Sequence, residues 1–112
     1  MITVKKLKEL GCDTDKGLER CLGNADFYLE FIPDALKKER YEKLEALINS
    51  KNLDAAFEAA HGLKGILSNL ALDPLLEPVV KLTELLRSRT DTDYSELLKE
   101  MWERYNLLAA EM

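Results

Sequence analysis

A single histidine is the residue of this 112-residue chain best suited to chemistry, and its neighbours are unusual. His61 is followed by Gly62 and Gly65 in a segment whose apolar residues recur at helical spacing. A glycine inside a helix costs about 1 kcal/mol relative to alanine, so two glycines beside one titratable side chain need a reason. Either the helix ends there, or another molecule must approach the backbone closely.

The helical periodicity places His61 away from the buried side of its helix. The predicted buried stripe consists of Leu53, Ala56, Phe57, Ala60, Leu63, Leu67 and Leu70. This stripe continues past Gly65, which argues against a helix end at the glycines. At 100° per residue His61 lies about 120° from the centre of the stripe, with Lys64 and Gly65 one turn away. We therefore expect a partly exposed His61, with the Lys64 ammonium extending outward beside it.

The common roles of a histidine find little support around His61. A Ser-His-Asp arrangement needs both partners close to the ring, whereas Asp54 and Ser68 lie about two turns away on the same helix. A zinc or iron site needs three or four ligands, and one histidine with two distant cysteines has no recognisable spacing. No glycine-rich phosphate loop is present, so we expect no ATP site and no bound cofactor.

A histidine that is itself the reactive group remains possible. A neutral imidazole is nucleophilic near pH 7, and a neighbouring ammonium compensates the charge of an arriving phosphoryl group. The residues alone leave this role open beside a plain exposed histidine without chemistry.

The composition predicts an all-α protein. Hydrophobic residues make up 46% and charged residues 33% of the chain, with only three prolines and five glycines. Helical spacing continues over 25–50, where Pro33 should bend or break the helix, and over 53–70, about 74–87 and 93–109. We expect one domain, 1–112: an antiparallel up-and-down four-helix bundle over about 25–112, with short helices in 3–22 covering one end.

Charge and hydropathy limit the partners. The formal charge of −5 disfavours nucleic-acid binding. No apolar run reaches the roughly 20 residues of a membrane span, and no signal peptide begins the chain. Cys12 and Cys21 are expected to be reduced and packed in or near the core. These features predict a cytoplasmic protein, and we expect a monomer.

The segment around His61 resembles the signature of histidine-containing phosphotransfer (HPt) domains of bacterial multistep phosphorelays. The matching residues are Ala60-His61-Gly62-Leu63-Lys64-Gly65, followed by Asn69-Leu70-Ala71. Residues 11–28 also resemble the lead-in helix of bacterial members. One position departs from the family pattern: Ala71 stands where a second glycine is usual, and we expect this to cause a local shift without loss of function.

The resemblance implies a four-helix bundle with three site residues. His61 would be the phosphoacceptor, Lys64 would stabilise the phosphoryl group, and Gly65 would leave room for the partner. The partners implied are response-regulator receiver domains, which supply the Mg²⁺, and a hybrid histidine kinase. Such a protein transfers phosphate without ATP-dependent kinase activity. The alternative is a helical adaptor that binds a receiver or kinase without phosphotransfer, although an adaptor would not need the nucleophile.

Overall fold

The computed structural model describes residues 2–112, and within them it is entirely helical. Seven helices are present: α1 (Val4–Glu9), α2 (Thr14–Arg20), α3 (Ala25–Ala35), α4 (Lys38–Asn49), α5 (Leu53–Asn69), α6 (Asp73–Arg87) and α7 (Ser95–Ala109). The predicted all-α class is confirmed. Residue 1 of the predicted domain lies outside the described residues.

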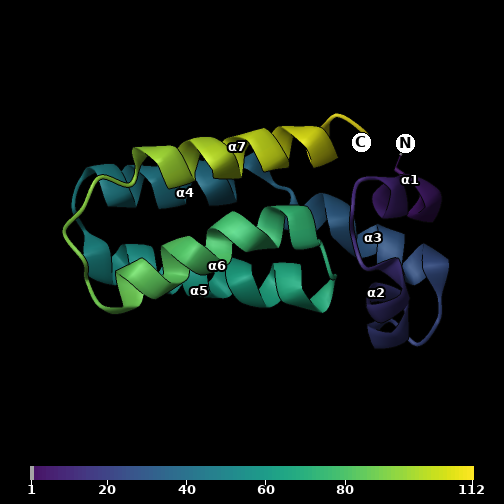
Figure 1. The fold of residues 1–112 in the computed structure, drawn as a ribbon. Coiled ribbons are helices and arrows are strands. Elements are labelled where there is room, and N and C mark those ends of the chain that lie inside the picture. Colours follow the sequence, from purple (N-terminus) through teal and green to yellow (C-terminus); the bar gives the residue numbers. More distant parts are fainter. Residues whose placement is uncertain (1) are drawn as a thin grey trace.

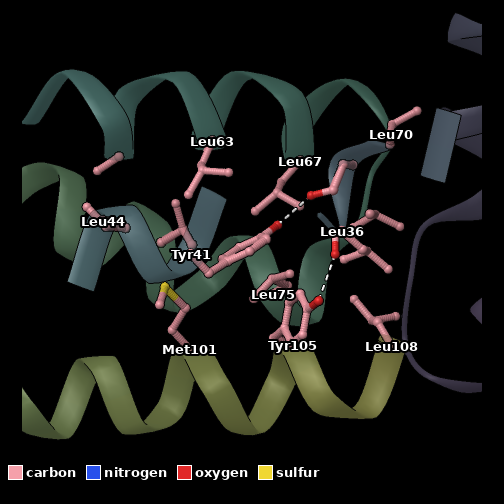
Figure 2. Packing of buried hydrophobic residues seen from close by; sticks show 14 of the residues in the cluster. Leu36, Tyr41, Leu44, Leu63, Leu67, Leu70, Leu75, Met101, Tyr105 and Leu108 are labelled. Atoms are coloured by element: carbon pink, nitrogen blue, oxygen red, sulfur yellow. Dashed lines mark hydrogen bonds between the residues drawn. The ribbon is translucent and has the colours of Figure 1, made fainter. Parts of the chain in front are cut away.

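The four long helices α4–α7 form the bundle, and consecutive helices pack against each other (Figure 1). Short turns join α4 to α5 and α5 to α6, so these neighbours run antiparallel. Leu63 and Leu67 of α5 face Met101 and Tyr105 of α7 across the core (Figure 2). The buried residues of α5 pack into this core, and His61 lies on the exposed side of the helix.

The predicted helix over 25–50 is broken near Pro33, one of the two outcomes that the sequence allowed, and α4 begins at Lys38. Pro33 lies inside α3 and provides no backbone N–H, and α3 ends two residues later at Ala35. After a two-residue turn α4 starts in a new direction, while α3 packs with α1 and α2 at one end of the bundle (Figure 1). Three short helices, α1, α2 and α3, therefore lie at this end of the bundle (Figure 1).

Buried tyrosines hold this break in place. The hydroxyl of Tyr41 donates to the backbone oxygen of Ala35 over 2.8 Å, and that of Tyr105 donates to Leu36 over 2.7 Å (Figure 2). Both acceptors lie at the end of α3, where backbone oxygens lack partners within the helix. Across residues 2–112 no buried side-chain nitrogen or oxygen lacks a hydrogen-bond partner. Helical periodicity does not predict such hydroxyl contacts, because they join residues of different helices.

Two further expectations concern the cysteines and the membrane. Cys12 and Cys21 are free thiols, and both are buried as predicted. Burial and the nearby Asp73 carboxylate raise the pKa of Cys12 to about 12. No helix within residues 2–112 has the length and apolar character required to span a bilayer.

Candidate functional site

The site is built on α5, which runs without interruption through both glycines. Asn52 caps its start, since its side-chain oxygen accepts a hydrogen bond from the Ala55 backbone over 3.4 Å. The inward face consists of Ala56, Ala60, Leu63 and Leu67, all buried. Burial of this face holds the helix despite its two glycines. A helix end at the glycines is therefore excluded.

α5 ends at Asn69, and Ala71, the position where the sequence departs from the family pattern, follows its C-cap Leu70. Leu72 N–H donates to the Leu67 oxygen and Ala71 N–H donates to the Ser68 oxygen, which is the hydrogen-bond pattern of a Schellman motif. Ala71 adopts a left-handed backbone with φ of 53°. Glycine usually occupies this position because it has no Cβ to clash. The chain turns here as the motif requires, at the cost of backbone strain in an alanine.

Residues before the bundle hold the last turn of α5. The hydroxyl of Tyr28 donates to the Leu70 oxygen over 2.8 Å, and Asp13 N–H donates to the Ala71 oxygen over 3.2 Å. The Arg20 guanidinium donates to the Ser68 oxygen. Three residues of the N-terminal segment thus donate to three backbone oxygens at the end of α5, and of these the Ser68 oxygen also accepts from Ala71 N–H.

His61 is exposed on the outer face of α5, as predicted. Its ring stacks on Phe57 one turn earlier, with centroids 5.6 Å apart and an interplanar angle of 25°. The guanidinium carbons of Arg87 and Arg89 lie 5.1 and 4.9 Å from the centre of the Phe57 ring. Arg89 also binds the Asp54 carboxylate. One face of the histidine is therefore fixed by an aromatic ring, which in turn contacts two cations.

Lys64 lies one turn beyond His61, at the boundary between α5 and α6. Its ammonium is 3.7 Å from a carboxylate oxygen of Glu84, and its side chain is 32% exposed. The other oxygen of Glu84 is 3.3 Å from the Arg87 guanidinium. The expected position of Lys64 beside the histidine is thus observed, but its ammonium is paired with Glu84.

Gly62 and Gly65 face open space on the same side of the helix. A Cβ added at either glycine would meet no atom within 4 Å beyond its own helix neighbours. Gly17 is the opposite case, because a Cβ there would lie 2.6 Å from the Tyr28 ring. Packing within this chain therefore requires a glycine at 17 but not at 62 or 65.

An apolar surface lies beside this face, where α3 meets the end of α5. Phe27 and Phe31 are each 43% exposed, and their ring centroids lie 4.8 Å apart. A groove of about 510 Å³ adjoins them, lined by Arg20, Cys21, Phe31, Asp34, Ile66, Asn69 and Leu70. We call Phe27, Phe31 and Ile66 the α3 surface.

The structure brings together His61, Lys64 and Gly65, the three residues that the sequence singled out. Sequence reasoning missed Phe57 as a site residue, assigning it to the core, and it missed Glu84, Arg87 and Arg89 altogether. The spacing of four residues between Phe57 and His61 could have indicated the stacking. Glu84, Arg87 and Arg89 could not be predicted from the sequence, because their position beside His61 depends on how α6 packs against α5. Among the described residues, no three His, Cys, Asp or Glu side chains are grouped closely enough to hold a metal ion.

Comparison with known families places this chain in a defined class. The Hpt domain family matches residues 30–111, which include all of α4–α7 and the second half of α3, and the chain belongs to this family. Comparisons with curated proteins and with solved structures gave no significant match. Membership implies a phosphotransfer intermediate of a phosphorelay that interacts with two-component proteins. The matched range includes His61, Lys64 and Gly65, whereas Asp13, Arg20 and Tyr28 precede it.

Proposed function

We propose that this protein carries a phosphoryl group on His61 between the aspartates of response-regulator receiver domains in the cytoplasm. One imidazole nitrogen forms the new P–N bond as the P–O bond to the donor aspartate breaks. The aspartate leaves as a carboxylate, and the N–H proton of the ring passes to water. The receiver supplies Mg²⁺, so this chain contributes a nucleophile and its positioning.

The bare helix face around His61 is the observation that supports this proposal most strongly. Gly62 and Gly65 weaken α5 by roughly 1 kcal/mol each relative to alanine, yet no contact within the chain requires them. Their cost is explained if another protein must bring its own active site over the imidazole. An exposed histidine without chemistry would not need two glycines beside it.

The setting of the ring suits a nucleophile. Phe57 covers one side of His61, while the glycine side is open, so the ring is held but accessible. Lys64 is close enough to contact a phosphoryl group on the histidine, since the two side chains are one helical turn apart. Its pairing with Glu84 is exposed, and such pairs contribute only about 0–1 kcal/mol, so the ammonium can exchange partners.

The α3 surface supports docking of a receiver beside the histidine. Ile66 and Asn69 continue the outer face of α5 from Gly65 toward the groove. Exposed aromatic and aliphatic side chains gathered on one face are typical of a protein-binding surface. With a net charge of −5 the domain should not attract acidic partners at long range, so we expect apolar contact and Lys64 to dominate docking.

The test is transfer from phosphorylated receivers of the same cell. Wild-type protein should gain acid-labile phosphate, and His61→Gln should gain none while remaining folded and able to bind the receiver. Lys64→Ala should slow transfer with little loss of stability. Binding without any transfer to the wild type would favour the adaptor, and transfer that persists in His61→Gln would exclude His61 as the carrier.

A further inference from the structure

The carboxylate of Glu84 on α6 pairs with two of the cations near the histidine, Lys64 and Arg87. One oxygen lies 3.7 Å from the Lys64 ammonium and the other lies 3.3 Å from the Arg87 guanidinium. Within residues 2–112 neither cation forms an ion pair with any other carboxylate. Glu84 is therefore the anion that these two side chains hold before any phosphoryl group arrives.

The register of α5 against α6 places this cluster at the level of His61. Lys64 pairs with Glu84, while Phe57 lies against Arg87 and Arg89. Because the two helices run antiparallel, His61, which lies between 57 and 64, is level with the turn of α6 between Glu84 and Arg87. A phosphoryl group on the ring would thus arrive between the two cations and near the carboxylate.

Exposure allows the cations to change partners. The side chains of Lys64, Glu84 and Arg87 are 32%, 55% and 48% exposed, so water and salt weaken their pairing. A phosphoryl group carries about two negative charges and three acceptor oxygens, and it competes well for ammonium and guanidinium groups. Once the cations turn to it, Glu84 is left as an unpaired anion close to a dianion.

We propose that Glu84 tunes the phosphoryl affinity of His61 by competing with the phosphoryl group for Lys64 and Arg87. This inference rests on the proposed function of His61. The competition makes the phosphohistidine less stable than two free cations would make it, which keeps the group easy to pass on. Glu84 acts through Lys64 and Arg87 and is a tuning residue; it does not touch the reacting atoms.

Glu84→Gln tests the proposal with phosphoramidate as the donor, so that no receiver is needed. The P–N bond of the donor breaks, the new P–N bond forms at the ring, and ammonia leaves with the ring proton as ammonium. Because freed cations attract the anionic donor, Glu84→Gln should be phosphorylated about threefold to tenfold faster than wild type. The pH midpoint of the phosphohistidine ³¹P signal should also move lower, since freed cations favour the dianion.

Glu77→Gln is the matched control. Glu77 lies on the same helix and pairs with Lys81 at 4.0 Å and with Arg104 at 3.8 Å, away from the histidine. Its rate and midpoint should equal those of wild type. Equal values for Glu84→Gln, or a wild type that phosphoramidate does not phosphorylate, would overturn the inference.

A mutant cycle between Glu84 and its two partners tests whether Glu84 acts through Lys64 and Arg87. In a protein that also carries Lys64→Ala and Arg87→Ala, Glu84→Gln should change the rate by less than about twofold. A full effect in that background would show direct charge repulsion and would refute the competition. The proposed function fails separately, if receivers transfer no phosphate to His61 in the wild type.

Discussion

The hydroxyl of Tyr28 donates a hydrogen bond to the backbone oxygen of Leu70 over 2.8 Å, tying α3 to the end of the helix that carries His61. The side chain of Tyr28 is fully buried, and its pKa is raised, mainly by burial. The ring fits only because residue 17 is a glycine. The histidine helix is thus held at its end by a segment outside the matched part of the family.

Removing this hydroxyl should destabilise the fold. We expect Tyr28→Phe to lower the free energy of unfolding by about 1–3 kcal/mol, because the buried Leu70 oxygen loses its partner. Urea unfolding measures the change. Tyr94→Phe is the control, since its hydroxyl bonds to the Thr90 oxygen in a partly exposed loop and its loss should cost less. A Tyr28→Phe protein as stable as wild type would contradict this view of the contact.

Replacing the open glycine should separate stability from transfer. Gly65→Ala should raise the free energy of unfolding by up to about 1 kcal/mol, because the added methyl meets nothing and helix propensity improves. The same methyl lies where a receiver must approach, so transfer should slow on the order of tenfold or more. Thermal unfolding and transfer assays measure the two effects.

Asn106→Ala, on the exposed face of α7, controls for stability alone. It should improve helix propensity without slowing transfer. If Gly65→Ala transferred phosphate at the wild-type rate, residue 65 would have no role in receiver access.

Two left-handed residues should respond differently to glycine. Lys51 is exposed with φ of 60°, and Lys51→Gly should stabilise the protein by about 1 kcal/mol through relief of backbone strain. Ala71→Gly gains similar relief but loses a buried methyl worth about 0.8 kcal/mol, so its stability should change less. Urea unfolding of both variants checks the order. If Ala71→Gly raised the free energy of unfolding more than Lys51→Gly, Ala71 would carry strain in addition to that of its left-handed backbone.

The carboxylate at the corner between α3 and α4 should make stability depend on pH. A hydrogen bond from Lys37 is the main cause that lowers the pKa of Asp34, with Arg40 also contributing. A lowered pKa in the folded state means that this contribution is complete above the unfolded value, about 3.9, and is lost as the pH falls through the folded value.

Asp34→Asn should therefore be less stable than wild type at pH 7, with the difference shrinking toward pH 2.5. Chemical unfolding at both pH values measures this difference in stability. The control is Asp91→Asn, because Asp91 forms no ion pair within the described residues, and this variant should show no such trend. A constant difference at both pH values would rule out the charge of Asp34 as the cause.

The sequence predicted the features that depend on a single helix. The spacing along α5 placed His61, Lys64 and Gly65 on an outer face, because helical periodicity alone fixes those directions. The break near Pro33 was one of two predicted outcomes. The direction that α3 takes after this break was not predicted, because it depends on the hydrogen bonds from the Tyr41 and Tyr105 hydroxyls to the end of α3. The Glu84 pairing also depends on how α5 packs on α6, which local patterns do not encode.

The central claim is that His61 carries the phosphoryl group, and the most direct test is to locate that group on the protein. Wild-type protein is incubated with a phosphorylated receiver, digested at neutral pH and analysed by tandem mass spectrometry. The account predicts a single modification of 80 Da, about the mass of one phosphoryl group, on His61. Phosphate on another residue, or none on a protein that binds the receiver, would contradict it.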